Sequence, residues 1–182
     1  MSEYISDLKV ITGVLNGNGD YSVLLARYKT RIYSFLLRML GNPHDAEDVA
    51  QETFIKAYKN LASYDTNRPF ISWLFAIAHN CAIDFIRKRG TQLLSLDDDE
   101  NPVSIADTAL CTEKAAQSAC DMQAVESALL KLPPIYKEAF LLLAKEGLEY
   151  AEIAEITGVP ISSVKIRIFR ARQLIMKYLG EM

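Results

Sequence analysis

The chain has 182 residues, of which 50% are apolar and 24% charged, an ordinary composition for a soluble globular protein of one domain or two small ones. No stretch approaches the roughly 20 consecutive apolar residues that cross a bilayer, and the start lacks a secretory signal, so we expect a cytoplasmic protein without direct membrane insertion. The net charge of −3 is unevenly distributed, because residues 1–90 carry 11 basic and 9 acidic side chains, residues 91–121 carry 1 and 7, and residues 122–182 carry 8 and 7.

Helical periodicity dominates the whole sequence. Apolar residues recur at spacings of three and four, whereas runs of alternating β-branched residues bounded by tight turns are lacking. We therefore predict an all-α fold with two small helical domains, residues 1–90 and 122–182, joined by a flexible acidic linker, residues 91–121. The linker has the composition of a solvated tether. The alternative is a strip that mimics nucleic acid or covers the basic surfaces of the unbound protein.

Three long helical patterns make up the first predicted domain. Residues 21–40 form an amphipathic helix that ends at Gly41. A second helix covers residues 43 to about 61, because Asn42 is a suitable N-cap and acidic side chains follow in the first turn. A third covers residues 70 to about 89. The apolar stripe of the first helix consists of Leu24, Leu25, Tyr28, Ile32, Phe35, Leu36 and Met39.

The third of these helices carries an unusual polar face. Trp73, Asn80, Asp84 and Arg87 share one side at spacings of 7, 4 and 3, and the helix ends in the basic run 87–89. A single tryptophan is commonly part of the core. An aromatic ring beside cations is also typical of proteins that stack on unpaired bases. Both interpretations of Trp73 remain open at this point.

The second predicted domain ends in the layout of a helix-turn-helix. Gly158 and Pro160 form a turn between a short acidic helix and a long basic one, and the preceding helices are ended by the Pro133-Pro134 pair and by Gly147. The four helical patterns cover residues 122–132, about 134–145, 150–156 and 161–178.

The last helix has a packing face and a basic face. Val164, Ile168, Ala171, Ile175 and Tyr178 recur at spacings of 4, 3, 4 and 3, so we expect them on one buried stripe. The exposed N–H groups at the start of the helix suit phosphate. We therefore predict DNA contact through the opposite arc, which consists of Ser162, Ser163, Lys165, Ile166, Arg167, Phe169, Arg170 and Arg172.

Catalytic and metal-binding patterns are lacking in the sequence. The three cysteines, Cys81, Cys111 and Cys120, and the two histidines, His44 and His79, have no metal-ligand spacing, and there is no Gly-rich phosphate loop. We expect no enzyme activity, metal or cofactor, and indifferent thiols. The alternative for Cys111 or Cys120 is a redox sensor.

In four segments the chain resembles the extracytoplasmic-function (ECF) class of bacterial sigma factors. They are DAEDVAQETFIKAY, FISWLFAIAHNCAIDFIRKR, LPPIYKEAFLL and GLEYAEIAEITGVPISSVKIRIFRAR, in this order, and the similarity covers about residues 20–90 and 122–178. The resemblance implies a dissociable initiation subunit that binds core RNA polymerase and promoter DNA and directs strand opening. It also implies control by an anti-sigma factor. We expect a monomer when the chain is free.

The resemblance assigns roles to residues of this sequence. It places polymerase binding on Asp45, Glu47, Asp48, Gln51, Glu52 and Phe54, although Asp45 is equally explained as helix N-terminal charge. It places contacts to the minus-ten promoter element on Tyr64, Asn67, Arg68, Trp73, Asn80, Arg87, Lys88 and Arg89. It places contacts to the minus-thirty-five element on Ser162, Ser163, Lys165, Arg167, Arg170 and Arg172.

Some positions depart from the family pattern. Ala76 and His79 stand where relatives often have basic side chains, so contact of that helix with the DNA backbone would be weaker. Ile166 stands at a commonly small or polar position and could contact a thymine methyl group. Two other functions remain as alternatives, a free-standing helix-turn-helix regulator and a sigma-like protein that sequesters an inhibitor.

Overall fold

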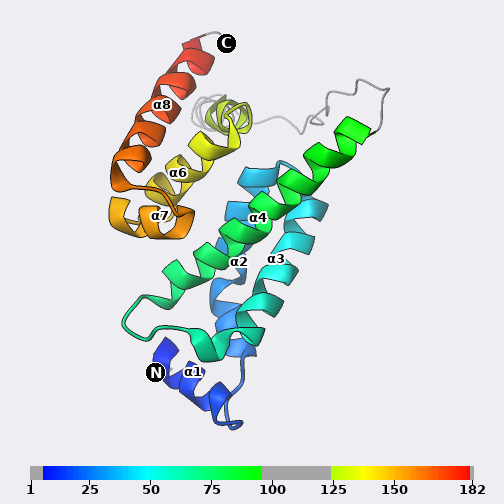
Figure 1. Cartoon of the computed structure of the whole chain (residues 1–182), viewed down its shortest axis with the longest axis vertical. Coiled ribbons are helices and arrows are strands. Elements are labelled where there is room, and N and C mark those ends of the chain that lie inside the picture. Colours follow the sequence, from blue (N-terminus) through cyan, green and yellow to red (C-terminus); the bar gives the residue numbers. More distant parts are fainter. Residues whose placement is uncertain (1–5, 96–123, 181–182) are drawn as a thin grey trace, which may run out of the picture.

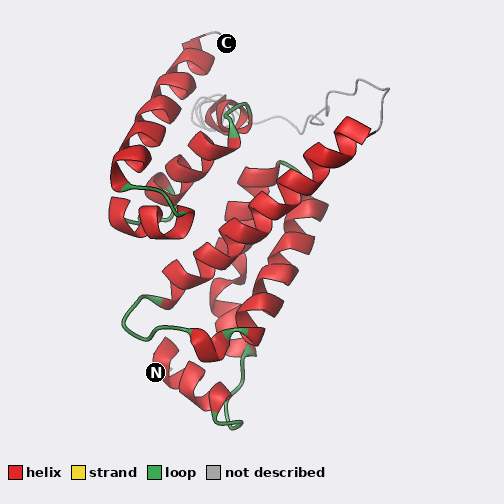
Figure 2. Cartoon of the chain, viewed as in Figure 1, coloured by secondary structure: helices red, strands yellow, loops and turns green. Residues whose placement is uncertain are grey.

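The computed structural model describes residues 6–95 and 124–180, and every regular element within these ranges is helical (Figure 2). The predicted all-α fold is confirmed, including a helix-turn-helix in the second half. Most of the predicted acidic linker, together with Cys111 and Cys120, lies outside the described residues.

The first helical block, residues 6–95, is built around three long helices, α2 (Ser22–Leu40), α3 (Pro43–Lys59) and α4 (Phe70–Ser95), which pack against one another (Figure 1). A 3-10 turn, η1 (Leu61–Ser63), follows α3. The short helix α1 (Asp7–Leu15) was not predicted. Tertiary contacts stabilise this helix, because the Asp7 carboxylate binds the side chains of Arg27 and Tyr28 on α2.

Local sequence explains where α3 begins. Asn42 is the N-cap, and its side-chain oxygen accepts hydrogen bonds from the backbone N–H of His44 at 2.9 Å and of Asp45 at 3.2 Å. Pro43 occupies the first helical position, where its missing N–H is not needed. The helix ends at Lys59, slightly before the predicted end near residue 61.

Helix α4 continues to Ser95, beyond the end predicted near residue 89. Gly90 does not end the helix, because its backbone is not in the left-handed region that ends helices elsewhere in this chain. A glycine in an exposed helix costs only about 1 kcal/mol relative to alanine. A glycine ends a helix only where its backbone takes up the left-handed turn, which Gly90 does not. No proline follows Gly90 within the helix to break it either.

The second helical block, residues 124–180, contains a helical segment at residues 124–130 followed by α6 (Pro134–Ala144), α7 (Tyr150–Thr157) and α8 (Ile161–Gly180). A capping box between Glu149 and Glu152 begins α7, and Gly158 ends it with a left-handed φ of 65°. The predicted packing stripe of α8 is buried at Val164, Ile168, Ala171 and Ile175, and Tyr178 is half-buried.

The two glycines provide a paired stability prediction. Gly158→Ala is expected to lower the free energy of unfolding by about 1–2 kcal/mol, because a side chain is disfavoured at positive φ. Gly90→Ala should raise it by about 0.5–1 kcal/mol, because nothing lies within 4 Å of a Cβ atom added there. Thermal and urea unfolding of both variants measures the two effects. Changes of the same sign in the unfolding free energies of the two variants would contradict the left-handed backbone at Gly158 and the helical backbone at Gly90.

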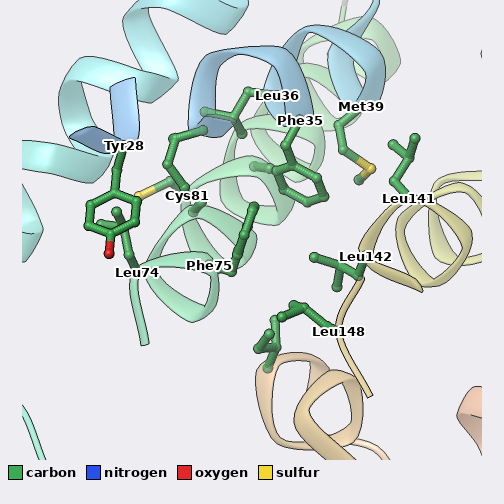
Figure 3. Close-up of a cluster of buried hydrophobic side chains, with 14 of the residues drawn as sticks. Tyr28, Phe35, Leu36, Met39, Leu74, Phe75, Cys81, Leu141, Leu142 and Leu148 are labelled. Atoms are coloured by element: carbon green, nitrogen blue, oxygen red, sulfur yellow. The ribbon is translucent and has the colours of Figure 1, made fainter. Parts of the chain in front are cut away.

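The two blocks share one continuous core. Helices α6 and α7 lie against α2 and α4 (Figure 1). Figure 3 shows the contact between the blocks as a cluster of buried side chains, with Leu142 and Leu148 of the second block close to Phe75 of α4. The members of this cluster that meet across the two blocks are Phe35, Met39, Phe75, Leu141, Leu142 and Leu148.

One segment of α4, Phe70–Gly90, is long and apolar enough to cross a membrane by length and composition alone. Core helices of soluble proteins pass the same test. Here α4 packs against α2, α3 and α7, and its residues Leu74, Phe75 and Ala78 are fully buried in the protein.

Candidate polymerase and promoter interfaces

A groove with a volume of about 700 Å³ runs between α2 and α3. Three residues predicted for polymerase binding line it, Glu47, Gln51 and Phe54. Phe54 is only 6% exposed and is part of the core as well as of the groove wall. The Tyr21 hydroxyl donates a hydrogen bond to the Phe54 carbonyl at 3.1 Å, and burial raises the pKa of Tyr21 to about 12. Most of the groove is lined by aromatic and aliphatic side chains, and Glu47 and Gln51 stand at its polar rim.

Three further apolar residues of this groove, Leu25, Ile55 and Tyr58, were not predicted as site residues. Leu25 was expected on the packing stripe of its helix but is 37% exposed, because the adjacent Leu24 takes the core position and consecutive helical residues point about 100° apart. Ile55 and Tyr58 are 54% and 55% exposed. Their spacing from Gln51, by four and then three residues, places all three on one face of α3. This helical spacing from Gln51 is the sequence feature that could have identified Ile55 and Tyr58 as residues of the same surface.

The acidic side chains of α3 have different surroundings. Glu47, Asp48, Gln51 and Glu52 are exposed, and Glu52 pairs with Lys56 at 2.8 Å. Asp45 instead pairs with Arg89 at 2.7 Å. Two residues predicted to bind different partners are thus bound to each other, and this pair ties the start of α3 to α4.

The loop before α4 is closed by its own hydrogen bonds. The Tyr64 hydroxyl donates to the Arg68 carbonyl, and its ring lies 5.4 Å from the rings of Phe70 and Trp73. Tyr64 is 9% exposed, and burial raises its pKa. Hydrogen bonds from the backbone and side chain of Asn67 lower the pKa of Asp65. Tyr64 and Asn67 therefore shape the loop, while the Arg68 side chain is exposed on it.

The remaining residues predicted for the minus-ten element are spread along α4. Trp73 is half-buried against Tyr64 and Phe70, so part of its ring packs and part is accessible. Asn80, Arg87 and Lys88 are exposed. At about 1.5 Å per residue, Trp73 and Arg87 are about 21 Å apart along the helix. The predicted residues thus form two groups, one around Trp73 and one at the basic end.

Helix α8 presents the face predicted for the minus-thirty-five element. Ser162, Lys165, Arg170 and Arg172 are exposed, whereas Ser163 and Arg167 are half-buried. Arg170 donates a hydrogen bond to the Tyr136 hydroxyl at 3.2 Å, which braces it against α6. Two large apolar side chains share this surface, Ile166 at 55% and Phe169 at 61% exposure.

Neither a metal site nor a reactive thiol stands out within residues 6–95 and 124–180. No group of three or more His, Cys, Asp or Glu side chains there is placed to hold a metal ion. Cys81 is buried, and burial raises the pKa of its thiol. A thiol of this kind is a poor nucleophile at neutral pH.

Comparison with known proteins matches both blocks to one family. Residues 24–92 match the model of sigma-70 region 2, and residues 122–175 match that of sigma-70 region 4. The chain is 38% identical over 186 residues to the ECF RNA polymerase sigma factor SigW of Bacillus subtilis (strain 168), covering 96% of this chain and 97% of SigW. The chain therefore belongs to the ECF class of RNA polymerase sigma factors.

Two solved structures share its fold. The sigma factor RpoE, in a co-crystal structure with the anti-sigma factor NepR from Bartonella quintana, matches with a TM-score of 0.73 and 26% identity, over 88% of this chain and 97% of that chain. CnrH, in complex with the cytosolic domain of CnrY, matches with a TM-score of 0.66 and 25% identity, over 96% of this chain and 94% of that chain.

Proposed function

We propose that this sigma factor binds core RNA polymerase through the groove between α2 and α3 and reads two promoter elements, one with each helical block. The observation that carries the proposal is the joint presence of an exposed apolar groove and an exposed basic helix-turn-helix face on one chain. It acts in the cytoplasm as a monomer when free, and it supplies no catalytic group because polymerisation belongs to the core enzyme. Its two working units are residues 1–90 and 122–182.

In this proposal the polymerase surface combines the acidic face of α3 with the apolar groove beside it. Glu47 and Gln51 stand at the rim, and Ile55 and Tyr58 extend the apolar wall. Exposed aromatic and aliphatic side chains beside a concave surface are the usual anchors of protein interfaces. Asp45 has a structural role in our proposal, because its carboxylate is already bound by Arg89.

The minus-ten element is proposed to contact the α4 side of the first block. Arg68 and the accessible part of Trp73 form one contact group, and Asn80, Arg87 and Lys88 form the other. Tyr64 and Asn67 support the loop rather than touch DNA, because their hydroxyl and amide groups are hydrogen-bonded within it. An aromatic ring flanked by cations suits unpaired bases, which every promoter must expose on opening.

An anti-sigma factor is the proposed regulator. Of the two similar solved structures, one is a complex of the sigma factor RpoE with the anti-sigma factor NepR, and the other is a complex of CnrH with the cytosolic domain of CnrY. An inhibitor of the same kind would compete with polymerase for the groove between α2 and α3. Its presence would be shown by co-purification of the full chain with a protein that blocks binding to core polymerase.

Run-off transcription tests the proposed function. Core polymerase is incubated with a promoter library, with and without this chain, and the transcripts are sequenced. A set of promoters transcribed only when the chain is present is the expected result. The absence of any selected promoter would overturn the proposal, and specific DNA binding independent of polymerase would favour a free-standing helix-turn-helix regulator.

The basic face of α8 yields a prediction about salt. Replacing Lys165 and Arg172 with alanine should weaken holoenzyme binding to the upstream element and reduce the slope of log K against log salt by about 2, roughly one per lost phosphate contact. Lys131→Ala is the control, because that ammonium lies 5.9 Å from the ring of Tyr178 near the other end of α8. Fluorescence anisotropy across a salt series measures the slopes. An unchanged slope in the double variant would remove α8 from the DNA interface.

A further inference from the structure

The middle of the exposed face of α8 is apolar. Ile166 is 55% exposed and Phe169 is 61% exposed. The two residues are three positions apart, so their side chains are neighbours on the surface of the helix. A single apolar residue on a protein surface is ordinary. This pair is different because it interrupts the basic face that the proposed function directs at DNA.

Ile166 points away from the core of the second block. At about 100° per residue, it lies about 170° around the helix from the middle of the buried stripe. That stripe consists of Val164, Ile168, Ala171 and Ile175. A side chain at this angle takes no part in the packing of α8 against α6 and α7, and it is therefore available to a partner.

Cations flank Ile166 on both sides. Lys165, which is exposed, precedes it, and Arg167, which is half-buried, follows it. Consecutive residues of a helix point about 100° apart, so the two cations diverge from Ile166 in opposite directions. The major groove of DNA is bordered by two phosphate backbones. A helix that turns Lys165 and Arg167 toward these backbones directs Ile166 at the base edges between them.

The position of Ile166 along α8 fits the same arrangement. It is the sixth residue of the helix, which begins at Ile161, and helix-turn-helix proteins read base edges with the N-terminal residues of their second helix. Ser162 lies one turn before Ile166 and Arg170 one turn after it. The Arg170 guanidinium is braced by its hydrogen bond of 3.2 Å to the Tyr136 hydroxyl. Polar groups that can fix the helix on DNA thus stand at both ends of the apolar contact.

One feature of the base edges in the major groove suits an aliphatic side chain. Every base pair presents hydrogen-bond donors or acceptors there, and thymine adds a methyl group on C5. Isoleucine neither donates nor accepts a hydrogen bond, so against another base edge it would leave polar groups without a partner. Ile166 therefore favours a 5-methylpyrimidine both by the contact it makes and by the contacts it denies to other bases.

We infer that Ile166 determines part of the promoter specificity of this sigma factor, by contacting the 5-methyl group of a pyrimidine in the minus-thirty-five element. Phe169 lies beside this contact and shields it from water. The inference rests on the proposed function of α8. Two bases carry the methyl group, thymine and 5-methylcytosine, and they are distinguished by experiment.

Removal of single methyl groups tests the contact. A promoter selected by the holoenzyme in run-off transcription is synthesised again with each thymine of its upstream element replaced in turn by deoxyuridine, which lacks only the methyl group. We expect deoxyuridine at one position, or at two adjacent positions, to weaken holoenzyme binding by about threefold to tenfold, as for the loss of one buried methyl group. Competition binding followed by fluorescence anisotropy measures the ratio.

Ile166→Ala should abolish this dependence, so that thymine and deoxyuridine bind equally at the sensitive position. Its salt slope should match that of the wild type, because no phosphate contact is lost. Met176→Ala is the matched control, because Met176 is 74% exposed on the same helix but lies about 15 Å further along it. The control should keep the wild-type ratio. Both side chains are exposed, so both variants should melt close to the wild type.

Methylation of cytosine distinguishes the two sources of the methyl group. The A·T pair at the sensitive position is replaced by a G·C pair, with and without a 5-methyl group on the cytosine. Stronger binding of the methylated pair by the wild type, and not by Ile166→Ala, would show that either pyrimidine supplies the methyl group. A response to deoxyuridine alone would support the inference with thymine as the only source.

Two results would overturn the inference. One is equal binding of the wild-type holoenzyme to all thymine and deoxyuridine versions of the element, and the other is an unchanged ratio in Ile166→Ala. Either result would leave Ile166 as an exposed residue without a role in specificity. A failure of the proposed function looks different, because then no promoter is selected, or the loss of Lys165 and Arg172 leaves the salt slope unchanged.

Discussion

Replacing Ile55 and Glu47 with lysine is expected to weaken binding of the chain to core RNA polymerase by about 100-fold, because anchors in an apolar interface each contribute about 2 kcal/mol or more. Ile55 is 54% exposed, so its loss removes little of the core. Glu47 lies on the rim of the same groove, where lysine reverses the charge. Surface plasmon resonance with immobilised core polymerase measures the affinity.

The control for this experiment is Leu15→Lys. Leu15 is 51% exposed and lies in α1, outside the groove. It should leave polymerase binding unchanged, and both proteins should unfold within about 1 kcal/mol of the wild type, as expected for exposed substitutions. Equal binding by the groove variant and the wild type would exclude the groove as the polymerase site.

Trp73→Ala is expected to reduce promoter opening by about 5-fold to 150-fold, because stacking of a base on an aromatic ring is worth about 1–3 kcal/mol. Permanganate reactivity of unpaired thymines, measured with the holoenzyme on a selected promoter, reports the open strand directly. The loss should appear in strand opening rather than in polymerase binding, because the α2–α3 groove does not include Trp73.

Packing is the competing role of this tryptophan. Its ring lies 5.5 Å from Phe70 and 5.4 Å from Tyr64, so alanine also weakens the core. Trp73→Phe keeps an aromatic ring in the cluster and should retain most of the opening activity. If Trp73→Ala lowers the melting temperature yet opens the promoter normally below it, the ring has a packing role only.

The helices of the first block illustrate what local sequence can and cannot specify. The start of α3 was predictable, because Asn42 and Pro43 are sufficient to set an N-terminus. Helix α1 was not, because its nine residues are stabilised by the distant side chains of α2 that bind Asp7. Short helices depend on such tertiary contacts, since they are marginal in isolation.

The candidate interfaces also contain some features that local sequence predicts and others that it does not. Periodicity correctly separated the packing stripe of α8 from its basic face, because the residues that α8 buries in its packing with α6 and α7 recur at helical spacing. Periodicity misassigned Leu25, since an apolar side chain on a surface groove has the same sequence signature as one in the core. Nor could it reveal that Asp45 and Arg89, 44 residues apart, form an ion pair.

The sequence by itself determined the helical fold class, the helix-turn-helix and the resemblance to ECF sigma factors, because helix periodicity, turn residues and family motifs are all local in the chain. Only the tertiary structure decided that the groove between α2 and α3 exists and that the acidic residues of the second block lie on Arg31, Arg68, Ser72 and His79. Contacts between residues far apart in sequence depend on how the helices pack, and no short segment of the chain encodes that packing.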